Sequence, residues 1–411
     1  YEISSCDWSS DVCSSDLVYL LSEFTDNFGP APLDAFQTKT PTYSSVKDVY
    51  YFMFQELKDA QSKIDVSIKP EDSEKKFDRA YEFDFAKWVK YANSMRMRLA
   101  MRLSEVDPAK AKAEFEDAAK NSYISSIDDV FRVKERDGWD PLAGVMSRGW
   151  NTFTMGATFA NIVVGLGGVK TSDLLTAAKY QPYIKAKNYL GRRLQDHWPS
   201  YTNDPYTGFF MDGLPYSIDP RFFTVYTLPL DDEHSFNPTT VKKDGKDVVN
   251  KDSIFYLYKV AEQVPEGAKP TKVDSINVKY AINGYSNGSW GDAGSANGAL
   301  SASYKTAPVI SKQYRKSENY RVFFGNWESF FLIAEAALRG WNVAMPAKTA
   351  YENGIKASFA YNKADESKLS DYLKSEDYNR VGTSVNWDHT AEPPASVEMD
   401  IVNGYTHKAE K

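Results

Sequence analysis

Residues 319–361 read NYRVFFGNWESFFLIAEAALRGWNVAMPAKTAYENGIKASFAY, and they predict two helices joined by a short turn. Asn326 suits the N-cap of the first helix, and Gly340 suits its end. Between them, apolar side chains recur at steps of three and four residues, which predicts one buried stripe. The stripe comprises Trp327, Phe330, Phe331, Ala334, Ala337 and Leu338.

The second helix of this stretch begins near Pro346, which suits the first turn of a helix. Its inward side is predicted to carry Ala350, Tyr351, Ile355, Ser358 and Phe359. The two helices together are about 36 residues long, which is near the period of a tetratricopeptide helix pair. The stretch therefore predicts one unit of a helical-repeat scaffold.

Further helix pairs are predicted between about residues 43 and 122. Ser45 and Asp48 form a capping box in front of a run with helical apolar spacing. Residues 85–103 predict another helix, and Asp107 suits the N-cap of its partner. The helix at 85–103 carries the cations Lys87, Lys90, Arg96, Arg98 and Arg102. Such a helix can dock on a membrane or an acidic partner, but scattered cations more commonly mark a solvated face, which we expect here.

Four segments in order resemble those of SusD/RagB-type nutrient-binding outer-membrane lipoproteins. They are FTDNFGPAPL at residues 24–33, WVKYANSMRMRLAMRLS at 88–104, IDPRFF at 218–223 and AEAALRGW at 334–341. The resemblance implies a mostly α fold, a tetratricopeptide-like scaffold that carries irregular, loop-rich insertions. Asp219-Pro220-Arg221 is a marker of this family, and we expect Arg221 to hold a loop through charge-assisted hydrogen bonds.

The function that the resemblance implies is non-catalytic binding of a nutrient at the cell surface. Such lipid-anchored proteins of the outer membrane deliver an oligosaccharide, as in starch utilization, to a SusC-like TonB-dependent transporter. No cofactor and no metal is expected. Peptide stays open as an alternative ligand, and two other functions stay open as well. These are a secreted glycan-degrading enzyme and a helical-repeat scaffold for protein partners.

The bulk properties narrow the classes of partner. The net charge is −7 and the pI about 5.4, which argues against nucleic acid, because phosphate binding needs a basic surface. No run approaches the roughly 18 apolar residues of a membrane span, so attachment would need a lipid or a partner. We expect a single domain over residues 18–411, with a loop-rich ligand-binding region near 124–315.

The first seventeen residues, YEISSCDWSSDVCSSDL, differ from everything after them. They are rich in Ser and Asp, lack periodicity and hold both cysteines, Cys6 and Cys13. The stretch resembles the translation of a sequencing adapter, and we expect it to be a non-native leader outside the fold. We also expect shortening at both ends, with the signal peptide, the lipid-anchor motif and a closing segment missing.

Catalytic patterns are weak in this sequence. The four histidines are scattered, and no spacing typical of zinc ligands occurs. The acidic cluster at residues 231–234 suggests a calcium or acid/base centre, but a polar loop is the more economical interpretation. The VGLGG run at 164–168 lacks the Lys-Ser/Thr of a phosphate loop, so it predicts a turn.

Carbohydrate binding matches the residues better. Sugars present flat C–H faces and many hydroxyl groups, so their sites combine aromatic platforms with polar side chains. The glycine-rich stretch at 283–304 supplies Tyr285, Asn287, Trp290, Asp292 and Tyr304, and the stretch at 196–216 supplies Trp198 and Tyr206. We predict that these seven residues contact the ligand, with packing roles as the alternative.

Overall fold

The computed structural model describes residues 7–35, 38–134, 159, 162–163, 165–170, 173, 217–227, 240–249, 254–258, 265, 268, 272–277, 309–311, 314, 319–379, 382–389, 396–401 and 405–410. The chain divides into two compact units. Unit 1 joins Tyr1–Glu135 to Tyr320–Tyr361, and unit 2 joins Arg136–Asn319 to Asn362–Lys411. Each unit is thus built from two separate segments of the chain. That both belong to a single domain stays a prediction.

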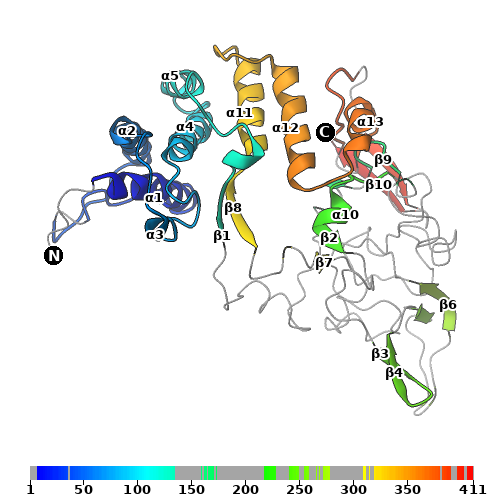
Figure 1. Cartoon of the computed structure of the whole chain (residues 1–411). Coiled ribbons are helices and arrows are strands. Elements are labelled where there is room, and N and C mark those ends of the chain that lie inside the picture. The colour runs from blue at the N-terminus through cyan, green and yellow to red at the C-terminus, as the bar shows by residue number, and fades with distance from the viewer. Residues whose placement is uncertain are drawn as a thin grey trace. The chain divides into compact units, whose positions relative to one another are not determined.

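Unit 1 is a set of helix pairs, as the sequence predicts, and α4 lies at its centre (Figure 1). The pairs are α1 (Asp7–Phe28) with α2 (Val46–Lys63), α4 (Phe85–Arg102) with α5 (Pro108–Ala119), and α11 (Asn326–Leu338) with α12 (Ala347–Tyr361). Helix α4 contacts α1, α2, α5 and α11. The short helices α3 (Asp72–Lys75) and η1 (Ile127–Asp129) complete the unit. The mostly helical, tetratricopeptide-like scaffold is confirmed.

Helix α1 starts inside the segment that the sequence sets apart. Its backbone is helical from Asp7, and it therefore includes Cys13, whereas Cys6 lies outside the described residues. Leu17 is 60% exposed, but the next residue, Val18, is 3% exposed and belongs to the core. That residues 1–17 are a non-native leader stays a prediction.

The caps of α2 and α5 confirm the local predictions. The Ser45 hydroxyl accepts a hydrogen bond from the Asp48 amide at 3.1 Å. The Asp107 carboxylate accepts one from the Lys110 amide at 3.4 Å. Each bond satisfies an amide that a helix N-terminus leaves without an intrahelical partner, so both helices begin at a definite residue.

The predicted cap of α11 is wrong by one residue. Gly325 is the N-cap, and Asn326 is the first helical residue and is buried. A Cβ at position 325 would lie 2.2 Å from the ring of Trp327, so only glycine fits there. Gly340 ends the helix as predicted. It has a φ of 71°, and its amide and that of Trp341 donate to the last turn in a Schellman motif.

The predicted apolar stripe accounts for only one of the two faces of α11 that contact other helices. The ring of Trp327 lies 4.7 Å from that of Tyr361, so this stripe faces α12, but Phe331 is 36% and Leu338 67% exposed. The buried residues are Asn326, Ser329, Ile333, Ala334 and Ala336. Helix α11 is covered on two sides, by α12 and by α4, and a periodicity argument that assumes one buried face misses the second.

A short antiparallel ribbon joins the two segments of unit 1. Strand β1 (Phe131–Lys134) pairs with β8 (Tyr320–Phe324). Phe131 stacks on Tyr91 of α4 with a centroid distance of 3.9 Å, and it lies 5.7 Å from Phe323. The aromatic core thus holds the returning segment against α4.

The expectation that the cations of α4 are solvated is wrong for Arg96 and Arg98, which are 2% and 8% exposed. The guanidinium of Arg98 donates to both carboxylate oxygens of Glu328, at 2.5 and 2.7 Å, and to the Phe323 carbonyl at 2.9 Å. It also lies 4.4 Å from the centre of the Phe324 ring. Because α4 is surrounded by other helices, Arg96 and Arg98 meet carboxylates from those helices instead of water.

Unit 2 contains short elements in its described residues (Figure 1). The helices are α10 (Phe222–Val225), η6 (Glu366–Lys368) and α13 (Leu369–Lys374). The strand pairs are β2 (Tyr226–Thr227) with β7 (Val309–Ile310), β3 (Thr240–Lys243) with β4 (Lys246–Val249), β5 (Ile254–Tyr258) with β6 (Lys272–Asn277), and β9 (Ser396–Ile401) with β10 (Tyr405–Glu410). The β3–β4 hairpin turns at Asp244 and Gly245, which both have positive φ, the backbone conformation that Asp-Gly pairs favour in two-residue hairpin turns.

We predict that Arg98→Met lowers the free energy of unfolding by about 2 kcal/mol, because Glu328, whose side chain is 31% exposed, would lose its cation and the Phe323 carbonyl would lose a hydrogen bond. Urea unfolding of purified protein measures this change. The control is Arg339→Met, which removes a cation that pairs with Glu105 and Glu335 at the surface and should cost less than about 1 kcal/mol. Equal losses for the two variants would contradict the central role of Arg98.

Candidate functional site

The predicted ligand residues lie outside the described residues. They are Trp290, Tyr285, Asn287, Asp292, Tyr304, Trp198 and Tyr206. The acidic cluster at 231–234 also lies outside them. The structure therefore leaves these predictions untested, and it describes two polar clusters elsewhere that sequence patterns did not single out as sites.

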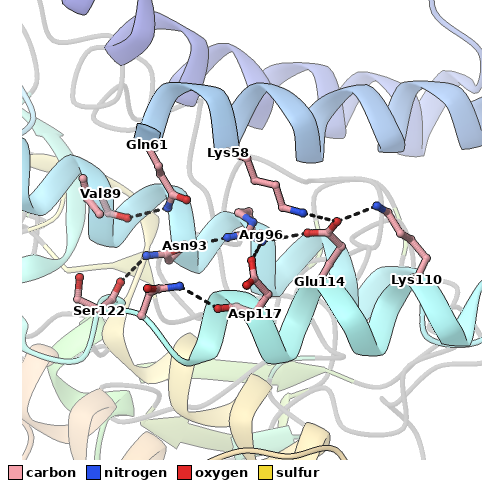
Figure 2. A network of polar contacts seen from close by, with 10 residues as sticks. Lys58, Gln61, Val89, Asn93, Arg96, Lys110, Glu114, Asp117 and Ser122 are labelled. Atoms are coloured by element: carbon pink, nitrogen blue, oxygen red, sulfur yellow. Dashed lines mark hydrogen bonds and ion pairs between the residues drawn. The ribbon is translucent and has the colours of Figure 1, made fainter. Parts of the chain in front are cut away.

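The first cluster is centred on Glu114 of α5 (Figure 2). Its carboxylate accepts hydrogen bonds from Lys58 of α2 at 2.7 Å, from Lys110 at 2.7 Å and from Arg96 of α4 at 3.0 Å. Arg96 pairs with Asp117 as well. Three helices thus meet at one buried carboxylate.

The polar groups that flank this cluster are satisfied by the backbone. Asn93 donates to the Ser122 carbonyl at 2.8 Å, and Gln61 donates to the Val89 carbonyl at 3.3 Å (Figure 2).

Because the carboxylate of Glu114 is surrounded by cations, it is a poor general base. Burial acts to raise its pKa, but hydrogen bonds from Lys110, Lys58 and Arg96 outweigh burial and lower it to about 2. The cluster is therefore structural.

The second cluster is in unit 2, at the sequence marker of residues 218–223. Asp219 is 2% exposed, and its carboxylate accepts from the Arg221 amide at 2.9 Å, from the Arg221 guanidinium and from the Tyr372 hydroxyl at 2.7 Å. The guanidinium also donates to that hydroxyl, at 3.0 Å. The expectation that Arg221 holds a loop through charge-assisted hydrogen bonds is confirmed.

The charge state of Arg221 follows from this geometry. Burial disfavours the charge on Arg221, but hydrogen bonding to Asp219 and the charge of Asp219 outweigh burial, so the pKa of the guanidinium is raised. Arg221 therefore stays charged in its buried position beside Asp219.

The glycine-rich run near residue 165 packs against this cluster. Gly165, Gly167 and Gly168 all have positive φ, which confirms the predicted turn. A Cβ at Gly167 would lie 2.1 Å from the ring of Tyr372, so the turn approaches the ring more closely than any other residue allows. Glycine here serves packing and not phosphate binding.

Metal and membrane features are absent from the part of the chain that the structure describes. There, no three His, Cys, Asp or Glu side chains come together as a metal site would need. Also within the described ranges, no helix has the length and apolarity to cross a membrane.

The family model for SusD-like proteins, described as Susd and RagB outer membrane lipoprotein, matches residues 17–203 and 278–408. The chain belongs to the SusD-like family. The family resemblance seen in the four sequence segments is thereby confirmed. No curated protein matches this SusD-like chain.

Solved structures agree with the family. A SusD homolog from Parabacteroides distasonis matches with a TM-score of 0.60 and 23% identity, over 93% of this chain and 61% of the homolog. A chitin-binding SusD homolog from Flavobacterium johnsoniae matches with a TM-score of 0.57 and 21% identity, over 94% and 62% of the two chains. At such identities the likeness shows the fold. The SusD-like chain spans about three fifths of the length of these homologs.

We predict that Glu114 makes the free energy of unfolding depend on pH in the acid range. Its pKa in the folded protein, about 2, lies below the ordinary 4.5, so its stabilising effect is complete above pH 4.5 and is lost as the pH falls toward 2. The shift corresponds to about 3 kcal/mol. Glu114→Gln should therefore be less stable than wild type at pH 7, and the difference should shrink markedly by pH 3.

Urea unfolding of both proteins at pH 7, 4.5 and 3 measures this dependence. Glu335→Gln is the matched control, because Glu335 makes an exposed pair with Arg339, and its difference from wild type should stay small at every pH. A gap between wild type and Glu114→Gln that does not change with pH would refute the argument.

Proposed function

We propose that this SusD-like chain is a non-catalytic nutrient-binding protein of the cell surface that binds an oligosaccharide and delivers it to a TonB-dependent outer-membrane transporter. The observation that carries the proposal is the family match over residues 17–203 and 278–408. The family is described as outer membrane lipoproteins, which supports a lipid-anchored, surface-exposed location and a SusC-like transporter as partner.

The choice of a glycan as ligand has two independent supports. One structure with the same fold is a chitin-binding SusD homolog. The other support is the composition of residues 283–304, where aromatic side chains alternate with glycines and short polar residues. Aromatic faces stack on the C–H faces of sugars, and the polar groups fix the orientation of the hydroxyls.

The ligand contacts that we propose come from two stretches of the chain. Trp290 and Tyr285 form the platform, and Tyr304 lies in the same stretch. The carboxylate of Asp292 accepts hydrogen bonds from sugar hydroxyl groups, and the amide of Asn287 donates or accepts them. Trp198 and Tyr206 supply further aromatic contacts from the other stretch. Glycines keep bulk away from the ligand but raise the entropic cost of ordering the loop, so moderate affinity is expected.

The experiment that tests the function is calorimetry of the purified chain with chitooligosaccharides, maltooligosaccharides and peptides. Saturable binding of one glycan class supports the proposal, and binding of peptides alone contradicts its choice of ligand. The same glycans are then analysed for new reducing ends. If these appear and vanish in Asp232→Ala, the protein is a glycan-degrading enzyme. If nothing binds except other proteins, it is an assembly scaffold.

We predict that Trp290→Ala weakens glycan binding by about five- to thirty-fold, because stacking supplies roughly 1–2 kcal/mol. The Tm should change little, since an exposed platform adds little to the core. Trp327→Ala is the control, because Trp327 packs on Tyr361 in unit 1, and it should lower the Tm and leave the affinity unchanged. Unchanged affinity in Trp290→Ala, or a large fall in its Tm, would make Trp290 a packing residue.

A further inference from the structure

The segment from Ser217 to Thr227 in unit 2 is held by hydrogen bonds at both of its ends. Its residues Ile218, Asp219 and Phe222 are 1–2% exposed. At its start, the Ile218 amide donates to the Val169 carbonyl and the Asp219 amide to the Val163 carbonyl, both at 2.9 Å. The start of the segment is thus fixed against the glycine-rich turn at residues 165–168 and the residues on either side of it.

Its far end is fixed to a different part of the chain. Tyr226 pairs with Ile310 in the β2–β7 ribbon. The Ser311 amide donates to the Val225 carbonyl at 2.8 Å, and the Ser311 hydroxyl donates to the Thr224 carbonyl at 2.9 Å. An eleven-residue segment therefore has firm partners at both ends.

These attachments fix the ends of two long stretches of chain, one between Lys170 and Ser217 and one between Thr227 and Val309. Lys170 and Ser217 form an antiparallel bridge, so the chain between them starts and ends at one place. Thr227 pairs with Val309, so the chain between those residues also starts and ends at one place. The first stretch contains Trp198 and Tyr206. The second contains Tyr285, Asn287, Trp290, Asp292 and Tyr304.

The segment Ser217–Thr227 is consequently the shared base of both stretches. Asp219, Arg221 and Tyr372 lock this base to α13 through the hydrogen bonds described above. The lock is tight for a geometric reason as well, because the ring of Tyr372 fills the space that a side chain at Gly167 would need. Tyr372 is 1% exposed. A ligand would not reach it.

We propose that Asp219, Arg221 and Tyr372 form a positioning element for ligand binding, which fixes the points where the two stretches with the proposed ligand contacts begin and end. The inference rests on the proposed function. A ligand that touches both stretches binds well only if their bases are held in place beforehand, because ordering them on binding costs affinity. A cluster that serves only folding would affect stability and leave the affinity unchanged.

Tyr372→Phe is the decisive variant, because it removes the hydroxyl that bonds to Asp219 and Arg221 and keeps the ring against Gly167. Tyr50→Phe is its matched control. Tyr50 is also buried, at 4% exposed, and its hydroxyl donates to a carboxylate, that of Asp26, but it lies in unit 1. We expect a similar fall in Tm for the two variants and a loss of glycan affinity of about five-fold or more in Tyr372→Phe alone.

Affinity is measured by calorimetry with the chitooligosaccharide or maltooligosaccharide that binds wild type, at a temperature well below the Tm of every variant. Arg221→Lys is the second variant. It keeps the positive charge but loses the planar guanidinium group that bonds to both Asp219 and Tyr372, so it should also weaken binding. This variant tests the inference if Tyr372→Phe does not fold. Wild-type affinity in Tyr372→Phe, or equal weakening in Tyr50→Phe, overturns the inference. Failure of wild type to bind any glycan is a different result, which overturns the proposed function itself.

Discussion

Unit 1 depends on the link between Arg98 of α4 and Glu328 of α11, which are 230 positions apart in the chain. A buried guanidinium needs a carboxylate at the right place, and no residue near it in sequence supplies one here. The chain must therefore come back from unit 2 with Glu328 next to α4. Since the same cation also bonds to the Phe323 carbonyl and lies over Phe324, strand β8 is placed together with α11.

The second buried arginine of α4 determines how the other helices lie. Arg96 binds Glu114 of α5, and Lys58 of α2 reaches the same carboxylate (Figure 2). Buried ion pairs add little net stability compared with apolar packing, but breaking one of them is costly. We infer that this cluster favours the observed arrangement of the three helices, because it needs all of them at one buried carboxylate.

Unit 2 shows the same principle on a smaller scale. The buried carboxylate of Asp219 is satisfied by Arg221 and by Tyr372, and this arrangement holds a short segment against α13 and the glycine turn. Binding proteins commonly place variable loops on a rigid base, because the loops can then change with the ligand while the base does not. The described part of unit 2 has the properties of such a base.

The sequence by itself determined helices α2, α4, α5, α11 and α12, the caps of α2 and α5, the turn at Gly340 and the family, because these depend on neighbouring residues or on short motifs. It also gave the role of Arg221, whose partner Asp219 is two positions away, but not the contribution of Tyr372, which is 151 positions away. The seven ligand residues proposed for the site rest on sequence composition alone. Only the tertiary structure decided that Arg96, Arg98 and Asn326 are buried, because periodicity shows that a helix has faces but not how many of them other elements cover.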